Sequence, residues 1–234
     1  MFYGFDPTFI ILIPAIIFTV YAQRKVQSTY AAYSRVPIRR REMTGERVAR
    51  MILDHNGMSH VPIEIVPGNL TDNYDPTKDV MHLSEGTSKS SSIAAVAVAA
   101  HESGHAMQDG SNYAFLKLRI AMVPAVNLVS AISMPVIMLG IILVCVGYGI
   151  GGTFFNIGVI MFAVVVLFHT VTLPVEFDAS KRALQQLTAL NIIDDTEVNG
   201  ARKVLTAAGM TYVAALSVSL VMLIRMLFIR GNSN

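Results

Sequence analysis

The stretch from Ile120 to Val175, IAMVPAVNLVSAISMPVIMLGIILVCVGYGIGGTFFNIGVIMFAVVVLFHTVTLPV, contains no Asp, Glu, Lys or Arg. One helix needs about 20 apolar residues to cross a bilayer, so this run is long enough for two. The glycine-rich segment 147–152 divides it and favours a tight turn. Because Arg119 and Glu176 bracket the run, a two-span hairpin would return both residues to the same side of the membrane.

The composition agrees with a membrane protein. Of the 234 residues, 53% are hydrophobic and only 15% are charged, whereas soluble domains carry about 25% charged residues. This composition excludes a disordered or collagen-like chain, and the single cysteine excludes an internal disulfide framework. Phe9 to Ala22 predicts a further span that acts as an uncleaved anchor, and Ala207 to Ile224 predicts a last one. Four spans are therefore expected.

The distribution of charge predicts the orientation of these spans. Between residues 24 and 50 there are eight basic residues and two acidic ones, and a basic segment beside a span is typical of the cytoplasmic side. Topology and anionic lipid already explain this cluster, so no nucleic-acid partner is expected. The expected parts are a first span (1–22), a cytoplasmic catalytic part (23–118), a two-span hairpin (119–175), a cytoplasmic helical segment (176–206) and a last span (207–230).

The cytoplasmic part is expected to contain a small sheet among helices, which makes the fold class α+β and mainly helical. Capping and turn residues predict a helix from Thr44 to Asn56 and a buried helix over 93–108 that begins after Ser90-Ser91-Ser92. Alternating apolar residues over 61–65 predict an edge strand that contains Pro62, and 80–84 predicts a second strand. Residues 69–78 are expected to form a turn.

The buried helix carries the sequence His101-Glu102-Ser103-Gly104-His105. Histidines four residues apart project from one helix face and can bind one Zn²⁺ together. Glu102 points aside and could act as the general base toward a water on the metal, which is the chemistry of the HExxH motif. The alternative is a solvated helix end with two ordinary histidines, but such groups are costly on an apolar helix unless they are paired or bind metal.

A catalytic zinc needs a third protein ligand, and three alternatives were compared. A third histidine close behind the motif is excluded, because none follows until His169. Asp178 and Asp194 are possible. Glu176 is the best candidate, because the hairpin returns it to the side that holds the histidines, and Pro174 predicts that it lies in the first turn of a helix.

Two further histidines have possible roles. His82 lies on the predicted strand 80–84, where a substrate or oxyanion role competes with that of an ordinary surface histidine. His169 lies inside an expected span, where an ionisable group is a functional candidate, although a hydrogen bond to a neighbouring helix would also explain it.

Four segments together resemble a known family. They are Asp72-Asn73-Tyr74-Asp75-Pro76, Leu83-Ser84, residues 92–108 around the histidines, and Pro174-Val175-Glu176-Phe177-Asp178-Ala179-Ser180. They resemble the YugP-type neutral zinc metallopeptidases of bacterial membranes. The resemblance covers almost the whole chain. It implies a gluzincin-like membrane peptidase with a zincin-like catalytic part, related in layout to the HtpX-type and CAAX-prenyl proteases.

The resemblance also bears on the residues around the metal. Relatives often have an Asp four residues after the ligand Glu, where it orients a ligating histidine. Ser180 occupies that position here, and Asp178 is the nearest acid, so Asp178 is a possible partner of the zinc ligands.

The sequence thus predicts a zinc-dependent endopeptidase at the cytoplasmic surface of the cell membrane. His101, His105 and Glu176 would hold Zn²⁺, Glu102 would act as general base, and the strand 80–84 would hold a polypeptide substrate, which we expect to be a membrane protein. A non-proteolytic scaffold with a structural zinc is the alternative, but such a site has no use for Glu102. An ion transporter is disfavoured because the spans carry only His169 and Arg225 as polar candidates for a path.

Overall fold

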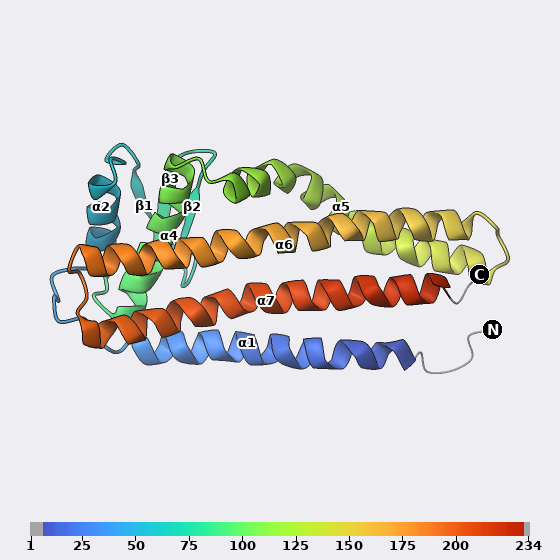
Figure 1. Cartoon of the computed structure of the whole chain (residues 1–234), viewed down its shortest axis with the longest axis horizontal. Coiled ribbons are helices and arrows are strands. Elements are labelled where there is room, and N and C mark those ends of the chain that lie inside the picture. The colour runs from blue at the N-terminus through green and yellow to red at the C-terminus, as the bar shows by residue number, and fades with distance from the viewer. Residues whose placement is uncertain (1–6, 232–234) are drawn as a thin grey trace. The chain divides into compact units, whose positions relative to one another are not determined.

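The computed structural model describes residues 7–231, so residues 1–6 of the expected first span lie outside it. The chain is mainly helical, with three short strands (Figure 1). The elements are, in order, η1 (Pro7–Ile11), α1 (Leu12–Tyr33), α2 (Gly45–His55), β1 (Ile63–Val66), β2 (Asn73–Asp75), β3 (Val80–Ser84), α3 (Glu85–Lys89), α4 (Ile93–Gly110), α5 (Ala114–Cys145), α6 (Gly151–Ala189) and α7 (Asp195–Gly231).

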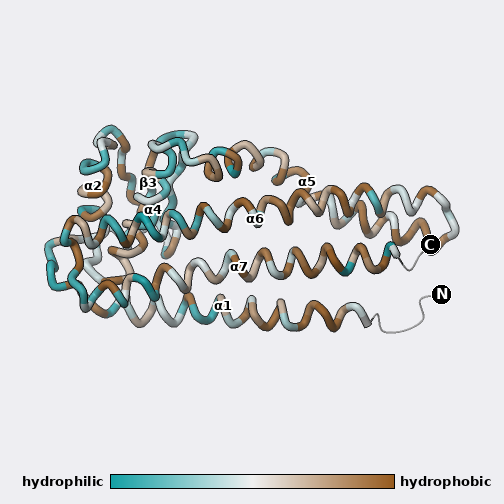
Figure 2. Tube along the Cα trace, viewed as in Figure 1, coloured by the Kyte–Doolittle hydropathy of each residue, from teal (hydrophilic) through white to brown (hydrophobic). Residues whose placement is uncertain are grey.

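Four helical segments are long and apolar enough to cross a membrane, as the sequence predicted. They are Thr8–Tyr33, Ala114–Cys145, Gly151–Ala189 and Asp195–Gly231. Hydrophobic residues dominate α5 and the N-terminal part of α6 (Figure 2). The turn between these two helices falls in the predicted glycine-rich segment, where Gly147 has a φ of +87°, a value that favours glycine.

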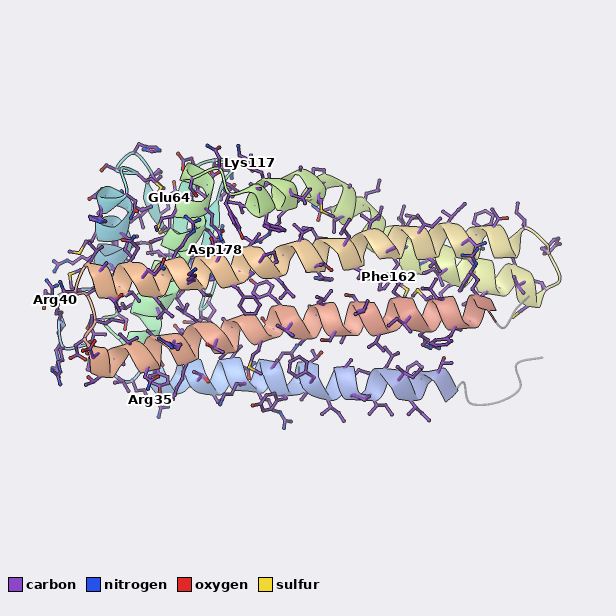
Figure 3. The ribbon with its side chains drawn as sticks, viewed as in Figure 1. Arg35, Arg40, Glu64, Lys117, Phe162 and Asp178 are labelled. Carbon is purple, nitrogen blue, oxygen red and sulfur yellow. The ribbon has the colours of Figure 1, made fainter. Side chains whose placement is uncertain are left out.

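The chain divides into two compact units. Within the described residues, the first unit comprises 7–21, 118–172 and 212–231. Its hydrophobic core includes Ile137, Phe155, Phe162 (labelled in Figure 3) and Met226. A Cβ atom on Gly140 would clash with the backbone nitrogen of Phe155. Glycine at this position therefore lets α5 and α6 approach each other closely.

The second unit comprises residues 22–117 and 173–211 and contains the sheet. The strand order is β1-β3-β2; β1 runs parallel to β3 and β2 runs antiparallel to it. The predicted edge position of β1 and the predicted strand at 80–84 are confirmed, but β1 begins at Ile63 and does not contain Pro62. The turn expected over 69–78 is wrong in part, because β2 lies inside it. Its three residues are too few for a periodic pattern, and pairing with β3 stabilises them.

The sheet order also corrects the expected role of the strand 80–84. As the central strand, β3 has neighbours on both edges: Met81 pairs with Ile63 of β1 and with Tyr74 of β2. A strand whose backbone groups already pair on both sides cannot add a peptide. The edges left open in this sheet belong to β1 and β2.

Helix α4 lies in the core of the second unit, and its beginning is as predicted. The Ser92 side chain accepts a hydrogen bond from the Ala95 backbone N–H, and Thr44 caps α2 in the same way. The core around α4 includes Val48 and Ile52 from α2 and Leu187 from α6. This packing fixes α4, which carries the two histidines, between its neighbours.

The expectation that Pro174 begins a helix is wrong. Helix α6 runs without interruption from Gly151 to Ala189 and contains Pro174, so Glu176 lies in mid-helix. An interior proline costs roughly 3 kcal/mol because it removes one backbone hydrogen bond and crowds the preceding turn. Burial offsets this cost, because a stripe at four-residue spacing is fully buried: Val175, Ala179, Ala183 and Leu187.

Candidate metal centre

Two helices of the second unit bring three potential metal ligands together. His101 and His105 lie one turn apart on α4, and Glu176 comes from α6. The Oε2 atom of Glu176 is 3.3 Å from Nε2 of His101 and 3.7 Å from Nε2 of His105. One ligand atom from each residue can be chosen so that all three lie within 4.8 Å of one another. Among the described residues this is the one group of three or more His, Cys, Asp or Glu side chains so arranged.

The spacing of these atoms fits a zinc ion. Bond lengths of about 2.0–2.1 Å in a tetrahedral site place neighbouring ligand atoms roughly 3.3–3.4 Å apart. The two distances to Glu176 Oε2 fall close to this separation. Two histidines and a glutamate are also the ligand set of one class of catalytic zinc site, which leaves the fourth position open.

The close approach of the two helices depends on a glycine between the histidines. A Cβ atom on Gly104 would lie 2.5 Å from the backbone oxygen of Ala179. Any larger side chain would push α6, which carries Glu176, away from α4. The Ser103 hydroxyl donates to the backbone oxygen of Ala99 and so stays within its own helix. Residues 103 and 104 therefore keep the space between the histidines and α6 narrow.

Gln108, which the sequence analysis did not single out, orients His105. It is fully buried, and its Oε1 lies 3.0 Å from His105 Nδ1. Its amide nitrogen donates to the backbone oxygen of Val175 at 2.7 Å and to Asp178 Oδ2 at 3.0 Å. Gln108 thus joins a histidine of α4 to the segment of α6 that bears Glu176. One feature of the sequence could have predicted this role: Gln108 is a polar residue three positions after His105 on an otherwise apolar helix.

Ser180 and Asp178 take different positions around the site. The Ser180 hydroxyl lies 3.2 Å from His101 Nδ1. Asp178, labelled in Figure 3, binds Gln108 and also receives a 2.6 Å hydrogen bond from Arg182 Nε. Each histidine thus has a partner at Nδ1, and Nε2 of each is directed to Glu176.

We expect Gln108→Leu to weaken zinc binding about 10- to 100-fold, as loss of a partner behind a ligating histidine typically does. The substitution keeps the volume and removes all three hydrogen bonds of Gln108. Zinc affinity measured by competition with a chelator would give the change. Gln185→Leu, on an exposed position of α6, is the control; equal affinity in the two variants would contradict an orienting role for Gln108.

Glu102 lies beside the three ligand candidates without joining their group. Its Oε2 accepts a 3.0 Å hydrogen bond from the backbone N–H of Tyr74 on β2. Burial raises the pKa of Glu102 to about 7, and the nearby Glu176 and Asp72 carboxylates add to this rise. A carboxylate with a pKa near neutrality can both accept and release a proton at physiological pH.

Tyr74 fixes β2 to α4. Its phenol oxygen lies 2.8 Å from Asp79 Oδ1 and 2.9 Å from Asp109 Oδ2. Burial and these two carboxylates raise the pKa of Tyr74, so its hydroxyl stays protonated. The residue therefore holds the N–H that contacts Glu102 at a fixed place. Tyr74 was quoted within a family motif, but its contact with Glu102 crosses 28 residues of chain and has no local signal.

Three other candidates do not belong to this group of converging ligands. His82 on β3 is 3.4 Å from Glu64 of β1, its partner in the sheet. Asp194 caps the start of α7 through Thr196 and forms an ion pair with Arg39 at 2.9 Å. His169 belongs to the first unit, where its ring contacts that of Phe168. The structure therefore does not bring Asp194 into the group of three.

The amino-acid sequence was also compared with known proteins. Residues 8–231 match the model of a family described as "Putative neutral zinc metallopeptidase". The chain belongs to this family. A relative within the curated proteins is the "Putative membrane protease YugP" of Bacillus subtilis (strain 168), which is 45% identical over 94% of this chain and 95% of its own length. This result confirms the resemblance found in the sequence. No solved structure matches this chain.

Proposed function

We propose that this protein is a zinc-dependent endopeptidase that hydrolyses membrane or membrane-associated polypeptides. The observation that carries the proposal is the convergence of His101, His105 and Glu176 with a buried carboxylate, Glu102, beside them. Membership of a zinc metallopeptidase family supports the same activity. In this proposal His101, His105 and Glu176 hold the metal. A scaffold with a purely structural zinc would not need Glu102.

The proposed roles follow from the positions of the side chains. A bound zinc would polarise the scissile carbonyl and lower the pKa of a water molecule. Glu102 accepts the proton of that water and delivers it to the leaving amine. The Tyr74 N–H holds the Glu102 carboxylate in place, while Gln108 and Ser180 orient the two imidazoles. Glu176 is almost fully buried, which keeps its carboxylate next to the histidines.

We assign the edge of β2, in place of β3, as the surface nearest to an extended substrate. The outer edge of β2 has no neighbouring strand within the sheet. Tyr74 on β2 directs its backbone N–H toward Glu102. A peptide lying against this edge would therefore meet the Glu102 carboxylate, although it could not pair with the Tyr74 N–H, which already donates to Glu102.

The activity should depend on metal. We expect treatment of the purified full-length protein with a zinc chelator to abolish cleavage of an unfolded test polypeptide, and added Zn²⁺ to restore it. The reason is that the metal held by these three ligands would supply the polarisation of the carbonyl and the activation of the water. Cleavage that persists after the measured zinc content has fallen to zero would refute the proposed mechanism.

The basic segment at residues 24–50 supports a cytoplasmic location for the proposed active site. Residue 149 lies in the turn between α5 and α6, which this orientation puts outside the cell. In a Cys145→Ser background, we therefore expect Gly149→Cys to react with an impermeant thiol reagent in intact cells. Lys89→Cys, at the end of α3, should react only after lysis. Labelling of Lys89→Cys in intact cells would reverse the orientation.

A further inference from the structure

A cavity lies between α1 and α7, within the second unit. Its volume is about 510 Å³, and it contains no residue of the candidate metal centre. Its lining combines three cations, three hydroxyl groups, a tyrosine and small or apolar side chains: Lys25, Arg202, Lys203, Ser28, Thr29, Thr206, Tyr33, Ala32, Ala207 and Met210. None of the residues that line this cavity has a role in the proposed peptidase activity.

The charges of the cavity have one sign. No carboxylate lines it, and within residues 7–231 none of the three cations forms an ion pair. By contrast Arg39, Arg50 and Arg182 of the same unit each pair with an Asp. The cavity therefore presents positive charge that the described part of the chain does not neutralise.

The hydroxyl groups add donors beside these charges. The Thr29 and Thr206 hydroxyls make no hydrogen bond within the described residues, whereas the Ser28 hydroxyl donates to the Lys25 backbone oxygen at 3.1 Å. Lysine, arginine and hydroxyl groups are the side chains that bind phosphate oxygens. The polar part of the cavity thus has the chemistry of a phosphate site.

The position of the cavity along both helices matches a membrane surface. Lys25 closely follows the apolar stretch 9–22 of the first span, and Arg202 and Lys203 closely precede the apolar stretch 207–224 of the last one. The two helices are in contact here, because a Cβ atom on Gly200 would lie 2.8 Å from the Tyr33 ring. Ala207 and Met210 then continue the wall toward the apolar part of α7.

We propose that this cavity binds the phosphodiester headgroup of an anionic glycerophospholipid. Lys25, Arg202 and Lys203 would contact the phosphate and the negative headgroup, and Thr29 and Thr206 would donate hydrogen bonds to it. The acyl chains would follow the apolar surfaces of α1 and α7. Basic pockets between membrane helices on the cytoplasmic side bind such headgroups. A soluble phosphate ion could bind to the same cationic and hydroxyl groups, but it would leave the apolar wall of the cavity uncovered.

Native mass spectrometry of the full-length protein, titrated with phosphatidylglycerol or phosphatidylcholine, tests the proposal. We expect one phosphatidylglycerol to bind saturably and phosphatidylcholine to bind at least tenfold more weakly. The triple variant Lys25→Gln, Arg202→Gln, Lys203→Gln should lose at least tenfold in affinity for phosphatidylglycerol. Millimolar inorganic phosphate, at constant ionic strength, should not displace the lipid.

The matched control is a triple variant that removes the same amount of charge outside the cavity: Arg35→Gln, Lys117→Gln and Lys181→Gln. Arg35 and Lys117 are labelled in Figure 3, and none of the three residues lines the cavity. It should bind like the wild type. Equal losses in both triple variants would overturn the proposal in favour of overall charge, and displacement by inorganic phosphate would assign the site to a soluble anion. If the cavity triple variant fails to fold, the affinities of the single variants Lys203→Gln and Lys181→Gln for phosphatidylglycerol give the same comparison. Peptidase activity is not the readout, so failure of this proposal and of the proposed function can be distinguished.

Discussion

Glu102→Gln should lower the peptidase rate roughly 10²–10⁴-fold, the usual effect of losing a general base, while the protein keeps its zinc. Glutamine has the same shape and can still accept the hydrogen bond from the Tyr74 N–H, but it cannot take up a proton from water. Glu102 is also absent from the group of three converging ligand candidates. Zinc per protein, measured by elemental analysis, and the rate of polypeptide cleavage would separate the two effects.

His105→Ala is the matched comparison for this experiment. It removes one of the imidazoles directed at Glu176, so we expect it to lose zinc and activity together. If Glu102→Gln cleaved substrate at the wild-type rate, Glu102 could not be the base. Loss of zinc from Glu102→Gln to the level of His105→Ala would make Glu102 a ligand instead.

The second large effect concerns the two acidic residues of α6 near the site. We expect Glu176→Ala to lose zinc as completely as His105→Ala, and Asp178→Ala to retain most of it. Only Glu176 has an oxygen 3.3 Å and 3.7 Å from the two Nε2 atoms. Asp178 is already bound to Gln108 and Arg182. Zinc content after identical dialysis of both variants measures the difference.

Asp178→Ala should still have a cost. Its carboxylate receives hydrogen bonds from Gln108 and Arg182, and Gln108 in turn contacts His105. We therefore expect a lower zinc affinity and a lower unfolding temperature, but a site that still fills at saturating zinc. Zinc retained in Glu176→Ala and lost in Asp178→Ala would reverse the assignment of the third ligand.

The sequence alone was sufficient for the features that depend on local patterns. A charge-free run of two bilayer lengths with glycines in its middle predicted α5, the turn and the apolar part of α6. Ser92 and Thr44 marked the beginnings of α4 and α2 because an N-cap needs only its own side chain and the next turn. The four-residue spacing of His101 and His105 likewise followed from helix geometry.

Local rules failed where burial or pairing outweighed them. Pro174 is a reasonable start for a helix, yet α6 continues through it because the stripe from Val175 to Leu187 is buried. The three residues of β2 have no strand pattern, and their pairing with β3 places the central strand out of reach of a substrate.

The sequence by itself determined that this chain has four apolar helices, belongs to the neutral zinc metallopeptidases and carries two histidines and a glutamate on one helix. Only the tertiary structure decided what surrounds them: Glu176 opposite the imidazoles, Gln108 and Ser180 behind them, and the Tyr74 N–H on Glu102. The physical reason is range. Helix formation and capping use neighbours within about four residues. The contact of Tyr74 with Glu102 instead joins residues 28 positions apart, and that of Ser180 with His101 joins residues 79 positions apart. The contacts of Gln108 depend on which face of α4 meets α6.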